Sequence, residues 1–218
     1  TNSGDAAFIT TAGIGTVPRD RVITRVGCKP GDIVYASGPL GMGGAVAARA
    51  LLDLPPELFA EANFRPTARV REASVIASFA SACIDTSDAL VAALDQLARL
   101  NDVGFDIDCP LDKLIHARAL AVAQALGVDP LVLLAQHHGE FELVFTVPAT
   151  RASAFEEAAR AAGFVQLRLG IATAETPSLR FLADRPRVLD GARIRNLLDD
   201  VGGDVRAYLA AIIDLVRN

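Results

Sequence analysis

The sequence predicts an α+β fold in which helices pack on one face of a mixed or antiparallel sheet. Short runs of β-branched residues alternate with amphipathic stretches, and the alternation does not repeat as regular βαβ units. The 218 residues are 51% hydrophobic, with a mean hydropathy of +0.34. A chain of this length and composition can bury a substantial core.

The first quarter of the chain predicts two strands and a helix. Residues 7–16 are rich in β-branched residues and predict the first strand. The turn Lys29-Pro30-Gly31-Asp32 precedes a second predicted strand at 33–36. A helix should then open in a glycine-rich stretch and run to about residue 52, before Pro55 and Pro56.

The middle of the chain contains the clearest amphipathic pattern. A helix is predicted over 66–80, with Pro66 near its first turn, and a short strand over 82–84. Residues 87–100 predict a helix with one apolar face, and the alternation over 103–108 predicts a strand. The apolar face of that helix is formed by Leu90, Val91, Leu94, Leu97 and Ala98.

The last part of the chain continues the alternation. Strands are predicted at 142–147, 164–172 and 179–183. Helices are predicted at 116–126 ended by Gly127, at 130–136, at 150–162 ended by Gly163, and at 196–216 with an interruption at Gly202-Gly203.

Composition excludes several classes of function. The formal net charge is −5, and no basic patch carries interleaved aromatic residues, so nucleic acid is not an expected partner. Cys28, Cys83 and Cys109 are an odd number without CxxC spacing, which argues against a disulfide framework or zinc site and favours a reducing cytoplasm. No apolar run approaches the ~18 residues that a membrane span needs.

The most informative segment is Ile84-Asp85-Thr86-Ser87-Asp88-Ala89-Leu90. Hard cations such as Mg²⁺ take oxygen ligands, typically one or two carboxylates together with phosphates. Asp85 and Asp88 could hold such an ion, and Ser87 could bond a phosphate oxygen. The alternative is local capping, in which Ser87 or Thr86 caps the following helix and Asp88 complements its dipole.

A second candidate is the glycine-rich segment from Ser37 to Gly44, which follows a strand and enters a helix. Gly38 and Gly41 would let the backbone approach a phosphate, and a helix N-terminus favours anions. Neither a Walker A loop nor a GxGxxG pattern is present, so a purely structural turn fits equally well.

Charged residues around these segments have two explanations each. Arg25, Arg65 and Arg69 could contact anions or could be solvated surface residues. Glu140 and Glu142 would share one face of a strand, where burial would raise a carboxyl pKa, although solvent-facing edge charges are the simpler account. The adjacent His137 and His138 could end a helix or contact substrate.

Taken together, IDTSDAL and the segment His137-His138-Gly139-Glu140-Phe141-Glu142-Leu143-Val144-Phe145-Thr146-Val147-Pro148 resemble the C-terminal half of the thiamine-monophosphate kinase family. There the patterns are IDxSDGL and GGEDYELLFTVP. Val17-Pro18, Arg25, the Lys29 turn, the Ser37 loop and Arg65-Pro66 follow in the same order. The resemblance covers about residues 5–183 and extends to the aminoimidazole-ribonucleotide-synthetase-like superfamily.

The resemblance implies an ATP- and Mg²⁺-dependent enzyme that passes the γ-phosphate to a small phosphorylated acceptor. It assigns Asp85 and Asp88 to Mg²⁺. It assigns Arg25, Ser87, Gly38 and Gly41 to the nucleotide, and His138 and Glu140 to the substrate. Two alternatives stay open: ATP-dependent dehydration or ring closure, and a non-catalytic binding module. Met42 and Ala89, which replace a family Asp and Gly, favour the module.

The resemblance also implies a domain organisation. Residues 1–26 would be the last strand and linker of an N-terminal ATP-binding domain, and residues 27–190 would be the C-terminal domain. The family's C-terminal segment has no counterpart in this sequence, and residues 191–218 are expected to form a helical tail instead. The missing N-terminal domain would carry the homodimer contact. We therefore expect this chain to fold alone and to be inactive alone.

Overall fold

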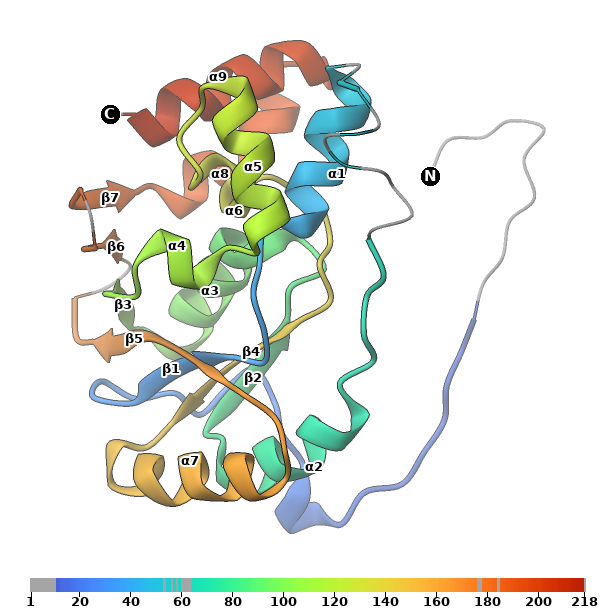
Figure 1. Cartoon of the computed structure of the whole chain (residues 1–218). Coiled ribbons are helices and arrows are strands. Elements are labelled where there is room, and N and C mark those ends of the chain that lie inside the picture. The colour runs from blue at the N-terminus through green and yellow to red at the C-terminus, as the bar shows by residue number, and fades with distance from the viewer. Residues whose placement is uncertain are drawn as a thin grey trace.

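The computed structural model describes residues 11–52, 54–55, 57, 59, 64–175, 178–183 and 185–217. Within them, a seven-stranded mixed sheet has the order β2-β4-β1-β5-β3-β6-β7 (Figure 1). Neighbouring strands run antiparallel except β3 and β6, which are parallel.

The strands are β1 (Ile33–Ala36), β2 (Ala82–Asp85), β3 (Gly104–Ile107), β4 (Leu143–Val147), β5 (Leu167–Thr173), β6 (Leu179–Phe181) and β7 (Arg187–Leu189). The helices are α1 (Met42–Leu51), α2 (Val70–Phe79), α3 (Ala89–Asn101), α4 (Leu111–Leu114), α5 (Ala117–Leu126), α6 (Val132–Ala135), α7 (Ala152–Ala161), α8 (Gly191–Asp200) and α9 (Val205–Arg217). Two short 3₁₀ turns lie at Arg19–Arg21 and Ala149–Arg151.

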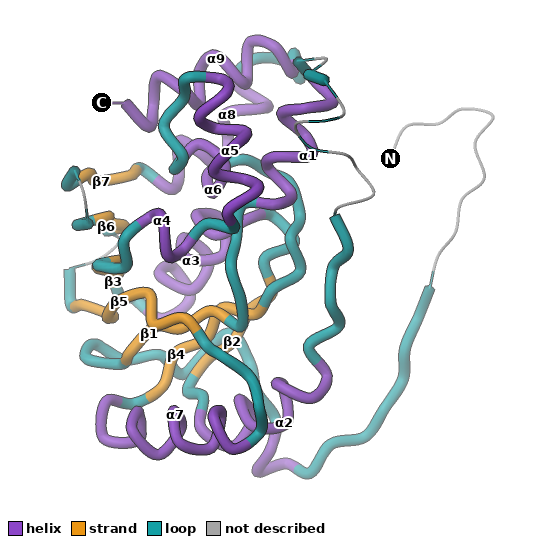
Figure 2. The backbone as a smooth tube through the Cα atoms, viewed as in Figure 1, coloured by secondary structure: helices purple, strands orange, loops and turns teal. Residues whose placement is uncertain are grey.

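Helices cover both faces of the sheet because β1 and β4 alternate apolar side chains. Val34 and Val144 point into the larger core, which contains α3 and most other helices. Tyr35 and Phe145 point to the opposite face, where α2 and α7 pack (Figures 1 and 2). The α+β class with a mixed sheet is confirmed, and the structure adds this smaller second layer to the expected one.

Most predicted elements lie where the sequence placed them. The strand predicted at 33–36 is β1, the amphipathic helix predicted at 87–100 is α3, and Gly202-Gly203 separates α8 from α9. The first strand is wrong for residues 11–16, which form no regular element, and residues 7–10 lie outside the described part of the chain. The helix predicted from residue 66 begins only at Val70.

The C-terminal helices are part of the larger core. Ile194 and Leu197 of α8, with Tyr208 and Ile212 of α9, are buried there. Cys28, Cys83 and Cys109 are free thiols. None of the helices in the described ranges combines the length and the hydropathy required to cross a membrane.

Candidate functional site

Four residues predicted from sequence meet at one polar hollow. Asp85 is the last residue of β2, and Asp88 directly precedes α3. They line a hollow of about 190 Å³ together with Arg25 and Ser87. Its remaining walls are Ile84, Ala92, Ala93 and Gln96. The strand–loop–helix turn thus presents two carboxylates and a hydroxyl on one side.

Arg25 is held near this turn by weak contacts. Its Nη2 lies 3.7 Å from Oδ1 of Asp85, and its Nη1 donates to Oε1 of Gln96 at 3.3 Å. The Arg25 and Asp85 side chains are 48% and 41% exposed. Exposed pairs of this kind contribute little to stability, so both groups stay available to a ligand.

The hydrogen-bonding part of the capping alternative for this turn is wrong. Asp88 occupies the N-cap position of α3, and its side chain makes no capping hydrogen bond there. The Thr86 hydroxyl instead accepts from the Glu142 N–H at 3.0 Å and donates to the Glu142 carbonyl at 3.2 Å. Capping hydrogen bonds therefore do not account for the two carboxylates. The charge of Asp88 does lie at the N-terminus of α3, where it complements the helix dipole.

Ala89 carries strained backbone at the start of α3. Its φ is +64°, a left-handed conformation that costs a non-glycine residue about 1 to 2 kcal/mol. The side chain is fully buried. The glycine that the kinase pattern carries here would relieve this strain, so the turn geometry explains the preference in that pattern.

The oxygen donors fit a particular kind of cation. Among the described residues, no group of three or more His, Cys, Asp or Glu side chains could enclose a metal ion. Asp85 and Asp88 offer two carboxylates beside the Ser87 hydroxyl. That donor set suits Mg²⁺ that takes most of its ligands from phosphate oxygens and water.

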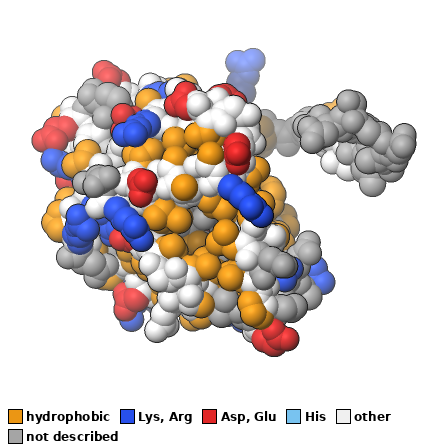
Figure 3. Space-filling model, turned by 90° about the horizontal axis from the view of Figure 1, so that it is seen from above, with side chains coloured by type: hydrophobic (Ala, Val, Ile, Leu, Met, Phe, Trp, Pro, Cys, Tyr) orange, Lys and Arg blue, Asp and Glu red, His pale blue; other side chains and the backbone are white. Residues whose placement is uncertain are grey.

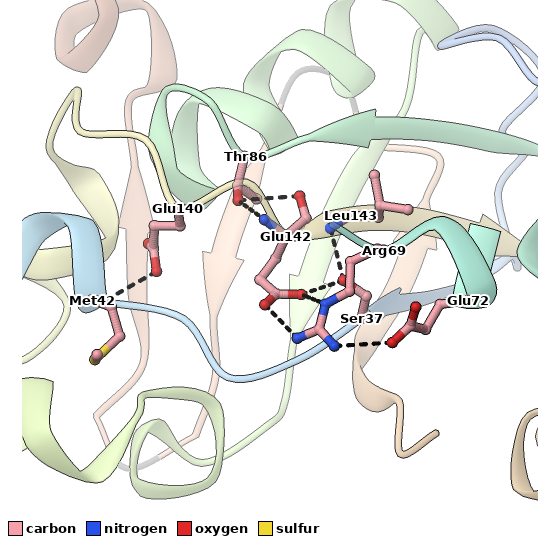
Figure 4. Close-up of polar contacts among 8 residues, drawn as sticks. All are labelled: Ser37, Met42, Arg69, Glu72, Thr86, Glu140, Glu142 and Leu143. Carbon is pink, nitrogen blue, oxygen red and sulfur yellow. Dashed lines mark hydrogen bonds and ion pairs between the residues drawn. The ribbon is translucent and has the colours of Figure 1, made fainter. Parts of the chain in front are cut away.

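A second hollow, of about 230 Å³, shares no lining residue with the first. Its polar wall contains both glutamates with Arg65, Arg69 and His116. Figure 4 shows how the two glutamates diverge from one another. Both are buried, so the prediction of solvent-facing edge charges is wrong.

Glu142 is fully engaged with its neighbours. Its carboxylate accepts from Nε of Arg69 at 2.7 Å and from Nη2 at 2.5 Å, and the Ser37 hydroxyl donates to it (Figure 4). The hydrogen bond to Glu142 raises the pKa of Arg69. Both carboxylate oxygens thus have a partner within the chain, which offsets the cost of burying the charge.

Glu140 is held differently. One carboxyl oxygen, Oε2, accepts from the Met42 N–H at 3.1 Å, while Oε1 is buried without a partner among the described residues. Burial raises the pKa of Glu140 to about 8. A buried carboxyl with a free oxygen on a cavity wall is a candidate for ligand contact.

The glycine-rich segment does not reach the Asp85 hollow. The N-terminus of α1, where an anion was expected, receives the carboxyl of Glu140 from the same chain. A Cβ on Gly38 would lie 2.5 Å from Nη2 of Arg69. Gly41 has φ +95°, and a Cβ there would lie 2.9 Å from Cγ2 of Ile115. Close packing accounts for both glycines, and their contact with a nucleotide stays a prediction.

His138 and Glu140 line different hollows. His138 borders a groove along α1 with Phe64 and Gly139, and burial lowers the pKa of its imidazole. His137 instead packs edge-on against Tyr208, with ring centroids 5.8 Å apart.

Sequence reasoning did not identify Gln96, which lines the Asp85 hollow. Gln96 lies two four-residue steps after Asp88, so both belong to one stripe of the helix. That spacing could have identified it as a wall of the hollow.

Comparison with known proteins identifies the family of this chain. Residues 29–179 match the family described as AIR synthase related protein, C-terminal domain. A thiamine-monophosphate kinase of Halobacterium salinarum is 39% identical over 154 residues, which are 71% of this chain and 49% of the kinase. A carbamoyl dehydratase HypE of Azotobacter vinelandii is 31% identical over 166 residues, 72% of this chain and 46% of the dehydratase.

The solved structures show the same fold. AaThiL complexed with AMPPCP and TMP superposes with a TM-score of 0.58 at 26% identity, covering 74% of this chain and 50% of AaThiL. The chain spans about half the length of the curated relatives it matches. Since the family match extends over more than half of the chain, this protein belongs to the AIR synthase related family and carries its C-terminal domain.

Proposed function

We propose that this chain contributes one side of an ATP- and Mg²⁺-dependent phosphotransfer site, of the thiamine-monophosphate kinase type. The observation that carries the proposal is the meeting of Arg25, Asp85, Ser87 and Asp88 around one polar hollow. Arg25 and Asp85 are 60 residues apart in sequence, and their approach has no role in the core. The kinase relatives, and the solved relative complexed with AMPPCP and TMP, support it.

Each residue has a role that follows from its chemistry. Asp85 and Asp88 hold the cation, and Ser87 donates a hydrogen bond to a phosphate oxygen. The planar guanidinium of Arg25 exchanges its weak contact with Asp85 for two parallel bonds to the polyphosphate. Bound Mg²⁺ supplies neutralisation of the charge on the transferred phosphate. The residues act by positioning and charge.

The acceptor side is proposed at the second hollow. Glu140 offers its free oxygen there, while Arg65 and His116 provide basic groups that suit a phosphorylated acceptor. His138 borders the neighbouring groove, so its substrate contact requires an acceptor that extends past Phe64. A homodimer, a cytoplasmic location and the domain limits at residues 26 and 190 stay predictions from the family resemblance.

ATP-dependent dehydration is the second candidate function. It is favoured by the carbamoyl dehydratase of Azotobacter vinelandii. That relative matches 72% of this chain, and the Halobacterium salinarum kinase matches 71%. Both reactions use the same nucleotide and differ in the fate of the phosphate. Only a kinase leaves the γ-phosphate on a released product.

The test is calorimetric titration of Mg·ATP into the natural polypeptide that carries this sequence. Asp85→Asn/Asp88→Asn should weaken binding at least ~10-fold, the ratio expected for about 1.4 kcal/mol of lost interaction. The control Asp112→Asn/Asp200→Asn removes the same charge at two exposed sites and should leave binding within ~2-fold. Absence of binding by the parent would leave only the non-catalytic module.

A labelled γ-phosphate then separates the two reactions. The first acceptor to be tested is thiamine monophosphate. Transfer of the label to the acceptor supports the kinase. Release of ADP and free phosphate with a dehydrated product supports the second candidate instead.

A further inference from the structure

A larger hollow lies at the opposite end of the molecule from α2 and α7. It has a volume of about 500 Å³ and lies between α1, α6 and α9. Figure 3, which looks onto this end, shows apolar side chains gathered between charged ones. Its apolar walls are Ala48, Leu51, Leu52, Leu126, Val128, Val132, Leu133, Leu209, Ala210 and Ile213.

The size and lining are those of a small-molecule site. Ligand pockets commonly measure about 300 to 1,000 Å³ and are mostly apolar with a few polar groups. One wall comes from α9, which lies outside the residues 29–179 that match the family. The hollow shares no lining residue with either polar hollow, and it shares only Leu51 with the groove that His138 borders.

Two polar side chains line this otherwise apolar hollow. Gln136 is 1% exposed, and its Oε1 has no hydrogen-bond partner among the described residues. An unpaired buried amide oxygen is unfavourable, and a hydrogen-bond donor on a ligand would relieve that cost. Arg206 lies on the rim, and its guanidinium forms no ion pair with the described part of the chain.

We propose that this hollow binds an amphiphilic organic anion. Its apolar body fills the space between α1, α6 and α9, an N–H or O–H donates to Oε1 of Gln136, and its anionic group pairs with Arg206. The charge on the rim favours an anion over a cation, and the buried acceptor favours a ligand that carries a donor.

The probe for this site is 1-anilinonaphthalene-8-sulfonate, which combines an apolar body, one N–H and one sulfonate. Fluorescence titration should show a single saturable site with one probe per chain. Ala210→Trp, at an exposed position of α9 that lines the hollow, should weaken binding at least ~10-fold by filling the space. Gln136→Leu should weaken it about 5-fold, because the leucine removes the acceptor.

Charge is tested on the same helix. Arg206→Glu should weaken binding about 5-fold or more, whereas Arg217→Glu, an equal charge change in the last turn of α9, should have less than ~2-fold effect. Arg206 is exposed, so this variant keeps the fold even if Ala210→Trp does not.

Two results would overturn the proposal. The first is a failure of the parent to bind the probe saturably, or a probe affinity that is the same in the parent, Ala210→Trp and Arg206→Glu. In the second case both variants must have the melting temperature of the parent. The other is a concentration-dependent dimer, seen by sedimentation, that both variants dissociate, because a second copy of the chain would then be the occupant.

Discussion

At the scale of single residues, Glu140 is the least expected feature of this protein. Its carboxyl is 4% exposed and has only part of its hydrogen-bonding capacity satisfied. Desolvation favours the neutral acid, so burial raises the pKa from 4.5 to about 8. The neutral acid can donate a hydrogen bond that an ionised carboxylate cannot, which matters for any acceptor bound in the second hollow.

This raised pKa predicts a pH dependence of stability. Below about pH 4.5 both the folded and the unfolded chain hold the Glu140 proton, so its full contribution is present. Between pH 4.5 and 8 only the folded chain holds it, and the free energy of unfolding falls as pH rises, by roughly 3 to 5 kcal/mol in total. Glu140→Gln should remove this fall, because the amide mimics the neutral acid.

Urea unfolding at pH 5, 6, 7 and 8 measures this effect. The difference between Glu140→Gln and the parent should grow steadily across the series in favour of the variant. Glu157→Gln on the exposed face of α7 changes the same group without burial and serves as the control. A variant whose advantage does not change between pH 5 and 8 would contradict the assignment.

At the scale of elements, the glycine-rich segment that leads into α1 fits two explanations, a phosphate-binding loop and close packing of the backbone. Its first half turns the chain out of β1, and its second half lets α1 approach neighbouring backbone. A Cβ on Gly43 would lie 2.4 Å from the carbonyl oxygen of Gly139, and one on Gly44 would lie 2.4 Å from that of Leu133. These contacts lie inside α1, where glycine is otherwise unfavourable.

Gly44→Ala therefore tests close packing against helix propensity. Propensity alone predicts that alanine inside α1 stabilises the protein by about 1 kcal/mol. The clash with the Leu133 carbonyl cannot be relieved by a side-chain rotation, so we expect a net loss of about 1 to 3 kcal/mol.

The comparison for this prediction is Ala50→Gly, at an exposed position of the same helix. It should lose about 1 kcal/mol through propensity alone. Chemical denaturation gives both values. A gain of stability in Gly44→Ala would show that α1 and α6 do not approach as closely as described.

At the scale of the whole molecule, Glu142 joins distant parts of the chain. Ser37 follows β1, Arg69 precedes α2, and Glu142 precedes β4, with sequence separations of 105 and 73 residues. The Arg69 and Glu142 side chains are only 19% and 12% exposed. This cluster fixes the rim of the second hollow where three segments of the chain meet.

A double-mutant cycle measures this link. Arg69→Met should cost about 2 to 4 kcal/mol, because it leaves the largely buried Glu142 carboxylate without its cation. Glu142→Gln should cost less, because Arg69 keeps its ion pair with Glu72 at 3.1 Å. The double variant should cost clearly less than their sum, with a coupling energy above ~1.5 kcal/mol. The exposed pair Arg168–Asp108, whose side chains are 47% and 50% exposed, should give less than ~0.5 kcal/mol in the same cycle. Equal coupling in the two pairs would refute the role of burial.

The sequence by itself determined most of the regular elements and the acidic motif for which we propose metal binding. The four-residue β1 and the amphipathic α3 are visible because β-branched runs and a helical period are local properties of the chain. Asp85 and Asp88 are visible because their spacing is local too. β7 was missed because three residues are too few to show a period, and the first strand was wrong for residues 11–16 because β-branched residues form a strand only beside a partner.

Only the tertiary structure decided which distant groups meet. It brought Arg25 to Asp85, placed the carboxyl of Glu140 on the N-terminus of α1, and paired Glu142 with Arg69. It also packed α9 against α6 and so formed the apolar hollow around Gln136. Such contacts depend on burial and on the closure of long loops. The local pattern of residues determines neither of these.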